Sequence, residues 1–190
     1  MEKVDFLLAS KSPRRIELLR NAGFQFSLID VNVDESKNPG EEPRKYVSRM
    51  AYSKSCQGFI IAEKQIPCLG ADTIVVKDNE IFGKPKDFED CRRMLGILSG
   101  SCHEVITAIC LFTAEKYYLQ LVESQVEFRH VSEQDIADYW NTGEPKDKAG
   151  SYAIQGIGAK FVRNYTGSLT NIIGLPMDET QKLLQSVISK

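Results

Sequence analysis

The stretch that decides the fold is Cys68-Leu69-Gly70-Ala71-Asp72-Thr73-Ile74-Val75-Val76. Its apolar and β-branched residues predict a buried strand. Asp72 interrupts this run, and an ionised carboxylate is costly to remove from water unless a cation or hydrogen-bond donors meet it. Asp72 is therefore either a catalytic carboxylate or a buried aspartate that caps a turn or pairs with a structural lysine, and the local sequence leaves both interpretations open.

A cation follows this strand closely in the sequence. A turn at residues 77–80 and a short strand at 81–83 lead into Phe82-Gly83-Lys84-Pro85-Lys86. This pattern predicts a hairpin that folds Lys84 back towards the strand of Asp72. Gly83 and Pro85 fix the backbone around Lys84 at the end of the hairpin, which makes Lys84 a stronger candidate for a site residue than Lys54.

The first predicted strand, at residues 4–9, is joined to a predicted helix at 13–21 by Ala9-Ser10-Lys11-Ser12-Pro13-Arg14-Arg15. The N–H groups at the start of a helix favour an anion, and Arg14 adds a bidentate fork while Ser10 adds a hydroxyl. The junction is thus a candidate phosphate site or, alternatively, a capped surface helix with solvated arginines. A Walker loop is absent, which excludes the common ATPase machinery.

Three further polar residues are candidate site residues, and for each of them an interpretation without a functional role is also open. Glu35, in a loop after a predicted strand at 24–33, can join Asp72 around a divalent cation, because magnesium commonly uses one or two carboxylates plus substrate phosphates. Otherwise it is an exposed acidic residue. Lys54, on a predicted helix at 43–64, faces the site or is solvated. Gln155 lies in a loop of small residues, where its carboxamide matches a nucleobase edge or makes an ordinary hydrogen bond.

Composition narrows the class of protein. A length of 190 residues suits one domain over 1–190, and 42% hydrophobic with 26% charged residues is typical of a globular protein. The net charge of -2 gives no electrostatic case for nucleic-acid binding. No apolar run is long enough to span a membrane, and we expect no signal peptide. The five cysteines contain no Cys-x-x-Cys pair, so we expect reduced thiols and a cytoplasmic location.

The order of elements predicts an α/β (mixed α+β) fold with a mixed sheet. Helices are expected at 88–98, 132–143 and 178–188, and two long neighbouring strands at 104–113 and 117–128. Residues 143–174 are rich in glycine and polar residues and lack periodicity. Such a long featureless connection is unusual in a compact domain, so we expect a binding loop there.

Several segments together resemble the Maf family of nucleoside triphosphate pyrophosphatases, also described as septum-formation-inhibitor-like proteins. Their order and spacing extend over nearly the whole chain. The segments that carry the resemblance are Leu8-Ala9-Ser10-Lys11-Ser12-Pro13-Arg14-Arg15 with Glu17-Leu18-Leu19, Val33-Asp34-Glu35, Gly70-Ala71-Asp72-Thr73-Ile74-Val75, Gly83-Lys84-Pro85, His103-Glu104-Val105-Ile106-Thr107, Gly150-Ser151-Tyr152 with Ile154-Gln155-Gly156, and Asn171-Ile172-Ile173-Gly174-Leu175-Pro176.

The resemblance implies an elongated mixed sheet with flanking helices and two lobes around a central cleft, similar to inosine triphosphate pyrophosphatases. It also implies hydrolysis of a nucleoside triphosphate to the monophosphate and pyrophosphate with a divalent cation, Mg²⁺ or Mn²⁺. The family pattern maps the proton acceptor to Asp72. It maps the phosphate and metal groups to Ser10, Glu35, Lys54 and Lys84, with Glu35 and Asp72 as metal ligands, and the substrate-choice positions to Arg14, Thr73 and Gln155.

The glutamine at position 155 resembles the branch of the family that acts on dTTP and UTP, since a branch acting on 7-methyl-GTP has glutamate there. The expected partner is a small nucleotide, without nucleic acid or membrane, and the family implies a homodimer. Two alternatives remain: a pyrophosphatase of purine or broader specificity, and a regulator of cell division that binds nucleotide without turnover.

Overall fold

The computed structural model describes residues 4–188, which contain both strands and helices. The strands are β1 (Phe6–Ala9), β2 (Phe26–Leu28), β3 (Cys68–Lys77), β4 (Glu80–Phe82), β5 (Cys102–Phe112), β6 (Tyr117–Phe128) and β7 (Val162–Thr166). The α-helices are α1 (Pro13–Asn21), α2 (Pro43–Ile61), α3 (Phe88–Leu98), α4 (Glu133–Asn141), α5 (Leu169–Ile173) and α6 (Met177–Ile188), with 3₁₀ helices η1 (Glu144–Asp147), η2 (Ala149–Ser151) and η3 (Ile157–Phe161).

The strands form one mixed sheet in the order β2-β1-β3-β5-β6-β7, and β4 pairs with β3. β1 is parallel to both β2 and β3, whereas β4 is antiparallel to β3 and β7 is antiparallel to β6. The predicted mixed α/β class and the β3–β4 hairpin are therefore confirmed. β5 and β6 are neighbours joined by a short turn, in which Thr113 N–H donates to the carbonyl of Lys116 at 3.0 Å.

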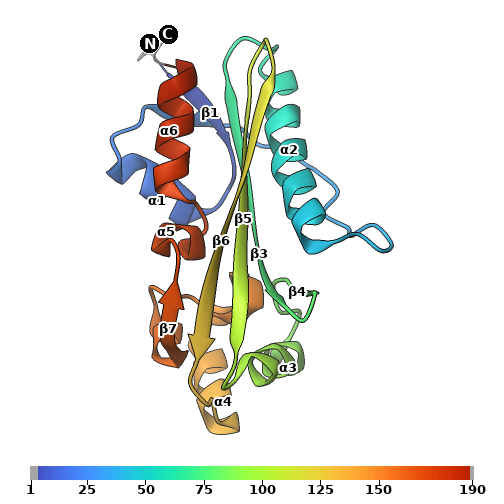
Figure 1. Ribbon diagram of the computed structural model, residues 1–190, viewed down its shortest axis with the longest axis vertical. Helices are drawn as coiled ribbons and strands as arrows, with labels where there is room; N and C mark the ends of the chain where they lie inside the picture. Colours follow the sequence, from blue (N-terminus) through green and yellow to red (C-terminus); the bar gives the residue numbers. More distant parts are fainter. Residues whose placement is uncertain (1–3, 189–190) are drawn as a thin grey trace. The chain divides into compact units, whose positions relative to one another are not determined.

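The chain divides into two compact units, and each is described here by itself (Figure 1). Unit 1 comprises residues up to Asp72, Thr107–Val122 and residues from Gly174, and unit 2 comprises Thr73–Ile106 and Glu123–Ile173. The chain passes between the units within β3, β5 and β6, and between α5 and α6. The single domain and the central cleft expected from the sequence stay predictions.

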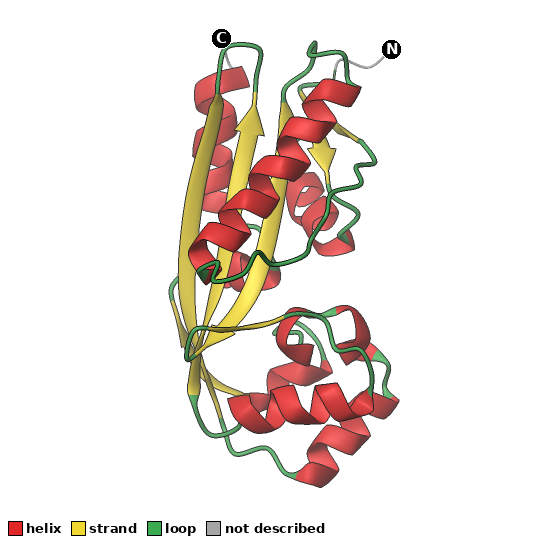
Figure 2. Cartoon of the chain, turned by 90° about the vertical axis from the view of Figure 1, so that its right-hand side faces the viewer, coloured by secondary structure: helices red, strands yellow, loops and turns green. Residues whose placement is uncertain are grey.

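In unit 1, the central strand segments are buried on both faces, namely β1, residues 68–71 of β3 and residues 107–111 of β5. Figures 1 and 2 show α2 on one face, with α1 and α6 on the other. β1 alternates accordingly, because Phe6 and Leu8 pack with residues of α1 and α6, while Leu7 and Ala9 pack with Phe59 of α2. Burial on both faces explains why these central segments are almost continuously apolar, whereas β2 and the start of β6, which are more exposed, are not.

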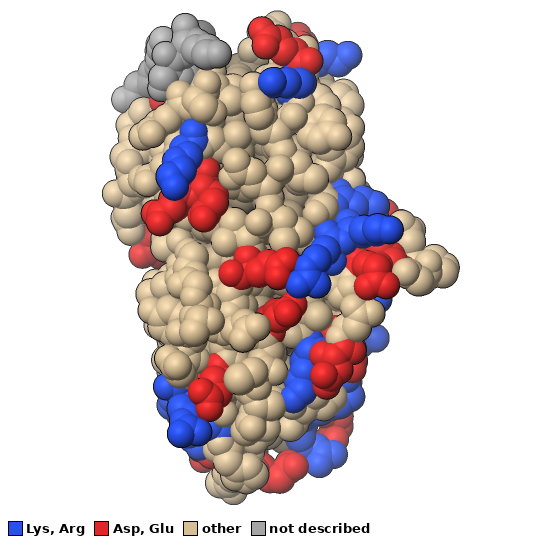
Figure 3. All heavy atoms as spheres, in the orientation of Figure 1, with Lys and Arg blue, Asp and Glu red and all other residues tan. Residues whose placement is uncertain are grey.

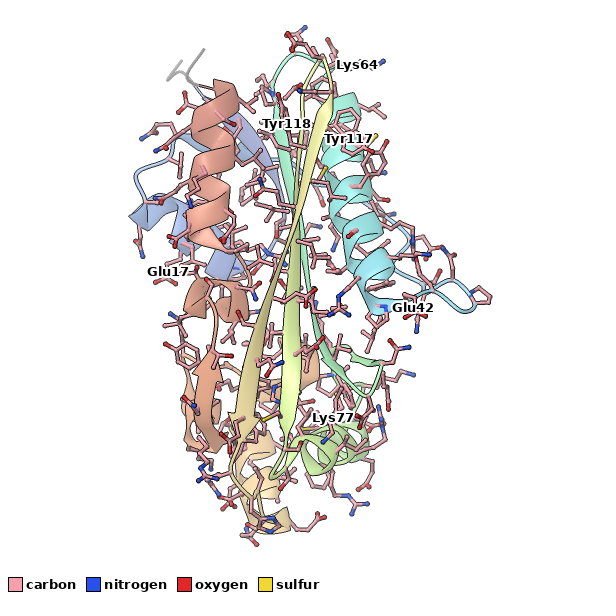
Figure 4. The ribbon with its side chains drawn as sticks, viewed as in Figure 1. Glu17, Glu42, Lys64, Lys77, Tyr117 and Tyr118 are labelled. Atoms are coloured by element: carbon pink, nitrogen blue, oxygen red, sulfur yellow. The ribbon has the colours of Figure 1, made fainter. Side chains whose placement is uncertain are left out.

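The same alternation is visible at the start of β6. Tyr117 lies on the side of α2, where its ring is 4.9 Å from that of Tyr52, and Tyr118 lies on the opposite side (Figure 4). Tyr118 packs on the cluster that contains the α6 residues Leu183 and Leu184. The period-2 pattern therefore continues across this part of unit 1.

In unit 2, α3 and α4 pack together around one apolar core. Both helices begin at a capped residue: Asp87 accepts from the N–H of Asp90, and Ser132 with Asp135 forms a capping box. Lys77, labelled in Figure 4, donates to the carbonyl of Ile97 near the end of α3 at 3.1 Å. The buried core residues are Val75, Phe82, Cys91, Met94, Leu95, Leu98, Val105, Val126, Phe128, Val131, Ile136, Tyr139, Tyr152 and Phe161.

The signals that predicted α1 are confirmed with one change. Ser12 is the N-cap residue and Pro13 the first helical residue, and Gly23 follows the helix with φ +80°. The Ser12 side chain makes no capping hydrogen bond. Instead the hydroxyl of Ser10 accepts from the N–H of Ser12 at 3.2 Å.

The expectation of a featureless segment at 143–174 is wrong. This segment contains η1, η2, η3, β7 and α5, and all five elements lie in unit 2. Each is too short to show a hydrophobic period, so none was visible in the sequence. Gly143 and Gly150 have positive φ of +78° and +66°, which explains the glycine content of their two turns.

Charge is spread over the surface in small groups. On the face drawn in Figure 3, acidic and basic side chains of the described residues are interspersed. Ion pairs between exposed side chains include Lys11 with Asp30 and Arg93 with Glu80. Among residues 4–188, no helix combines the length and apolar character needed to cross a membrane.

Candidate functional site

The strand that carries Asp72 approaches α2 very closely. A Cβ added at Gly70 would lie 2.5 Å from both the carbonyl of Ala51 and the N–H nitrogen of Ser55. The hydroxyl of Ser55 donates to the carbonyl of Cys68 at 2.7 Å. Glycine at position 70 therefore lets the backbones of β3 and α2 come together, and this brings Lys54, the neighbour of Ser55, within reach of Asp72.

Lys54 joins the two carboxylates that the sequence analysis proposed as metal ligands. Its ammonium lies 2.7 Å from Oδ1 of Asp72 and 2.7 Å from Oε1 of Glu35. The Lys54 and Asp72 side chains are only 13% and 15% exposed, whereas that of Glu35 is 59% exposed. A largely buried ion pair seldom adds stability over apolar packing, so this cluster is better explained by function than by stability.

A second cation, Arg15, lies buried beside this cluster. Its guanidinium donates to the carbonyls of Gly174 at 2.8 Å and Ala71 at 2.9 Å, and to the hydroxyl of Ser10 at 3.2 Å. Burial lowers the pKa of Arg15, while the carboxylate of Asp72 raises it. Arg15 therefore fixes the backbone next to Asp72 and orients Ser10.

The loop that carries Glu35 is fastened to α2 by two side chains. Tyr46 donates its hydroxyl proton to the carbonyl of Glu35 at 2.9 Å, and Arg49 donates to the carbonyl of Ser36 at 2.9 Å. Arg49 also forms a two-pronged ion pair with Glu41, at 2.7 Å for each bond. Burial and the nearby carboxylates of Asp72 and Glu35 raise the pKa of Tyr46 to about 12, so its hydroxyl remains a donor.

Thr73 and Lys84 belong to unit 2. The β3–β4 pairs Val75 with Phe82 and Val76 with Ile81 carry the chain back along β3 in the direction of Thr73. Lys84 follows directly and is exposed. The hairpin therefore returns Lys84 towards the residue that follows Asp72, as the sequence predicted.

Gln155 occupies the tip of a turn in unit 2. The N–H of Gly156 donates to the carbonyl of Ala153 at 3.4 Å, and the Gln155 side chain is exposed. The start of this loop is tied to the segment before Lys84, since Gly150 N–H donates to the carbonyl of Gly83 at 3.0 Å. Lys84 and the Gln155 loop thus belong to one hydrogen-bonded region of unit 2.

The predicted site residues divide between the two units. Ser10, Arg14, Glu35, Lys54 and Asp72 lie in unit 1, and Thr73, Lys84 and Gln155 lie in unit 2. Within unit 1 the structure brings Lys54, Glu35 and Asp72 into direct contact. Arg14 is half-buried next to Arg15, and its role as a phosphate fork stays a prediction.

The carboxylates fit a metal site that substrate completes. Within residues 4–188, no group of three or more His, Cys, Asp and Glu side chains is arranged to hold a metal ion. Glu35 and Asp72 nevertheless supply oxygen donors around one ammonium. A magnesium ion needs only one or two protein carboxylates when substrate phosphates and water fill its other positions.

Sequence reasoning missed Arg15, Tyr46 and the Arg49–Glu41 pair. Arg15 had a usable signal, because it lies four residues before Leu19 and both are buried on one face of α1. Tyr46 and Arg49 had none, since their partners lie in an irregular loop whose path the sequence does not specify. The contacts of these residues therefore became visible only with the fold.

Comparison with known proteins identifies the family. A family model described as Maf-like protein matches residues 5–187. The dTTP/UTP pyrophosphatase of Aliivibrio fischeri is 48% identical over 95% of this chain and 97% of its own length, and that of Photobacterium profundum is 46% identical over 100% of both. The Staphylococcus aureus Ham1 protein structure is 13% identical over 67% of this chain and 72% of its own, with a TM-score of 0.46, which is too distant to support an argument. The chain belongs to the Maf-like protein family.

Proposed function

We propose that this protein hydrolyses dTTP and UTP to the nucleoside monophosphate and pyrophosphate. The relatives named dTTP/UTP pyrophosphatase support this substrate class over almost the full length of the chain. The observation that carries the proposal is the Lys54 ammonium, which contacts both Asp72 and Glu35 at 2.7 Å. This contact supports the proposal, because Asp72 is the proposed proton acceptor, Lys54 a proposed phosphate-binding cation and Glu35 a second carboxylate.

Asp72 is the proposed proton acceptor. Lys54 holds Oδ1 of its carboxylate, which leaves Oδ2 to accept a proton from the water that attacks the α-phosphorus. A carboxylate within reach of the attacking water is a suitable general base. Arg15 holds the carbonyl of the preceding residue, Ala71, at 2.9 Å and so restricts the backbone of Asp72.

The triphosphate is held by cations and a hydroxyl. Lys54, Lys84 and Arg14 are the proposed contacts to its oxygens, and Ser10 adds a neutral donor near the start of α1. Cations aimed at the oxygens that gain charge stabilise the transition state more than the ground state. Pyrophosphate is the leaving group because attack at the α-phosphorus breaks the bond to the β-phosphate.

A divalent cation, Mg²⁺ or Mn²⁺, is the proposed cofactor, with Glu35 and Asp72 as its ligands. When bound, the ion neutralises phosphate charge and polarises the oxygens of the scissile group. The Glu35 side chain is 59% exposed, so it is able to turn from Lys54 to an incoming metal–nucleotide complex. Asp72 is more enclosed and changes its position less.

Gln155, with Arg14 and Thr73, is proposed to select the base. Uracil and thymine present an N–H donor flanked by carbonyl acceptors, and a carboxamide offers an acceptor and a donor to match them. An ionised glutamate at this position has acceptors alone. The exposed tip of the turn leaves the Gln155 side chain available to a ligand.

The test is pyrophosphate release across a panel of nucleoside triphosphates, with and without chelator. We expect pyrophosphate from dTTP and UTP, and little activity when the metal is removed. Orthophosphate as the first product, or full activity in excess chelator, contradicts the reaction class. Nucleotide binding without any turnover would instead support the regulator that binds nucleotide only.

A cytoplasmic location is also proposed for this protein. All five cysteines are free, three of them buried, which agrees with the reducing environment of the cytoplasm. Burial raises the pKa of the thiols of Cys68 and Cys110 to about 12, so neither is a reactive thiolate. The homodimer that the family resemblance implies stays a prediction.

A further inference from the structure

The backbone on both sides of the Gln155 turn is hydrogen-bonded to two side chains from outside the turn. Before the turn, the N–H of Ala153 donates to the hydroxyl of Tyr139 at 3.2 Å. After it, the N–H groups of Ile157 and Gly158 donate to the two oxygens of Glu144 at 2.9 and 3.0 Å. Tyr139 itself donates to Glu144 at 2.7 Å. These two side chains and their hydrogen bonds to the turn therefore form one connected network, which we call the clasp.

The glycines beside Gln155 allow this clasp to close. A Cβ added at Gly156 would lie 2.3 Å from Oε2 of Glu144, and one added at Gly158 would lie 2.6 Å from the hydroxyl of Tyr139. Neither glycine has a positive φ in the structure. Both are therefore explained by the closeness of the clasp and not by backbone conformation.

Besides the clasp, the turn is held by one internal hydrogen bond and by the packing of Ile154 against the core of unit 2. Its own hydrogen bond, from Gly156 to Ala153, is 3.4 Å long and therefore weak. Tyr139, in contrast, is fully buried, and its ring lies 5.1 Å from that of Phe161 in the core of unit 2. The clasp thus connects a weakly closed turn to a rigid core.

We propose that Tyr139 and Glu144 are positioning residues that orient Gln155 for selection of the nucleobase. The inference rests on the proposed function, because it concerns how the proposed base-reading residue is held. Neither side chain needs to touch the nucleotide. They act through the backbone on either side of Gln155. If this backbone moves, the donor and acceptor of Gln155 lose the alignment on which discrimination between nucleobases depends.

The ionisation of both groups agrees with this arrangement. Burial and the Glu144 carboxylate raise the pKa of Tyr139, so its hydroxyl stays a donor to Glu144. Burial opposes ionisation of Glu144, but the N–H of Gly158, the hydroxyl of Tyr139 and the N–H of Ile157 outweigh it and lower the pKa. Glu144 is therefore a carboxylate that accepts from three donors at once.

Two variants break the clasp in different ways. Glu144→Gln replaces one acceptor oxygen by an amide that is itself a donor, which sets a donor against the N–H of Ile157 or Gly158. Tyr139→Phe removes one oxygen, keeps the ring in the core and leaves the N–H of Ala153 without its partner. The second variant keeps the Tyr139 ring in the core, and a Tm near that of the wild type would guard against a failure to fold.

The experiment measures kcat/KM for dTTP and for GTP in each variant, with and without Gln155→Ala. We expect both single variants to lower the dTTP:GTP ratio by roughly five- to tenfold, the effect of a lost or mismatched polar contact. In the Gln155→Ala background the same changes should alter the ratio by less than about twofold, because coupled residues are not additive. The loss should appear in KM for dTTP more than in kcat, since Asp72 and Lys54 are untouched.

Asp135→Asn is the matched control. Asp135 lies on the same helix as Tyr139 and accepts from Ser132 and Arg129, and its ion pair with Lys160, at 3.9 Å, lies beyond the residues that the clasp holds. This variant should lower stability without moving the dTTP:GTP ratio. Hydrogen exchange should show faster exchange at Ala153, Ile157 and Gly158 in Glu144→Gln and not in Asp135→Asn.

The outcomes separate this inference from the proposed function. If the wild-type protein releases no pyrophosphate from dTTP, both are wrong. If the wild type is active but neither variant changes the ratio, or if the changes add fully to that of Gln155→Ala, the clasp does not act through Gln155 and this inference alone is overturned.

Discussion

The polar cluster of unit 1 and the Gln155 turn of unit 2 are built in opposite ways. In unit 1, charged side chains contact one another directly, with Lys54 between Glu35 and Asp72. In unit 2, the side chain of interest is neutral and exposed, and the contacts hold the backbone around it. The proposed roles therefore place turnover and base selection in separate parts of the chain, and we expect that each can be altered independently of the other.

The largest expected effect is that of Asp72→Asn. The change keeps side-chain volume and an oxygen for Lys54 but removes charge and proton acceptance, so kcat should fall about 10²–10⁴-fold. The dTTP:GTP ratio of kcat/KM should stay unchanged, since the base-reading turn is intact. A folded variant with near wild-type kcat, checked by its thermal unfolding, would remove Asp72 from the chemistry.

Gly70→Ala tests the backbone contact beneath the same cluster. The new Cβ would lie 2.5 Å from backbone atoms of α2, which have no rotamer to adjust. We expect a loss of about 1–3 kcal/mol in the free energy of unfolding, and a lower kcat because Lys54 moves with α2. Gly96→Ala in α3 is the control, since no atom lies within 4 Å of its Cβ position, and it should stabilise the protein by about 0.5–1 kcal/mol. Equal Tm shifts in the two variants would argue against the close approach.

Gln155→Glu tests the other side of the comparison. An ionised glutamate has no donor for a pyrimidine carbonyl, and a mismatch of this kind costs about 1–3 kcal/mol. The dTTP:GTP ratio of kcat/KM should therefore fall roughly tenfold to a hundredfold, while pyrophosphate release from GTP persists. A ratio that does not move would show that Gln155 does not read the base.

More of the polar cluster of unit 1 than of the Gln155 turn could be predicted from the sequence, and the reason is physical. The strand of Asp72 and the return of Lys84 depend on local signals, an apolar β-branched run and a turn between two short strands, and the structure confirms both. Lys54 was left undecided, because its position depends on Gly70 allowing α2 and β3 to approach. Such a close approach is a tertiary contact that no residue spacing encodes.

The contacts that hold the Gln155 turn could hardly be predicted from the sequence. Its partners Tyr139 and Glu144 come from the end of α4 and the start of η1, and the short elements around them have no period. The residue types were visible, but glutamate and tyrosine near a helix end are ordinary surface residues in most proteins. The glycines at 156 and 158 were the one local signal, and they indicate a close contact without naming the partner.

The smallest expected effect concerns the loop that carries Glu35. The Arg49 guanidinium lowers the pKa of Glu41 to about 2. A group whose pKa is lower in the folded protein stabilises it above the unfolded pKa of about 4.3, and this contribution is lost as the pH falls towards the folded value. The wild-type protein should therefore lose stability relative to Glu41→Gln between about pH 5 and pH 2, as measured by denaturant unfolding at each pH.

Asp135→Asn is the comparison, because Arg129 lowers the pKa of Asp135 to about 2 as well. This variant should reduce the acid sensitivity of the protein to a similar extent. At pH 7 only Glu41→Gln should weaken metal-dependent turnover, and only modestly, since Tyr46 still holds the carbonyl of Glu35. Parallel pH curves for wild type and Glu41→Gln would show that the ion pair does not hold this loop.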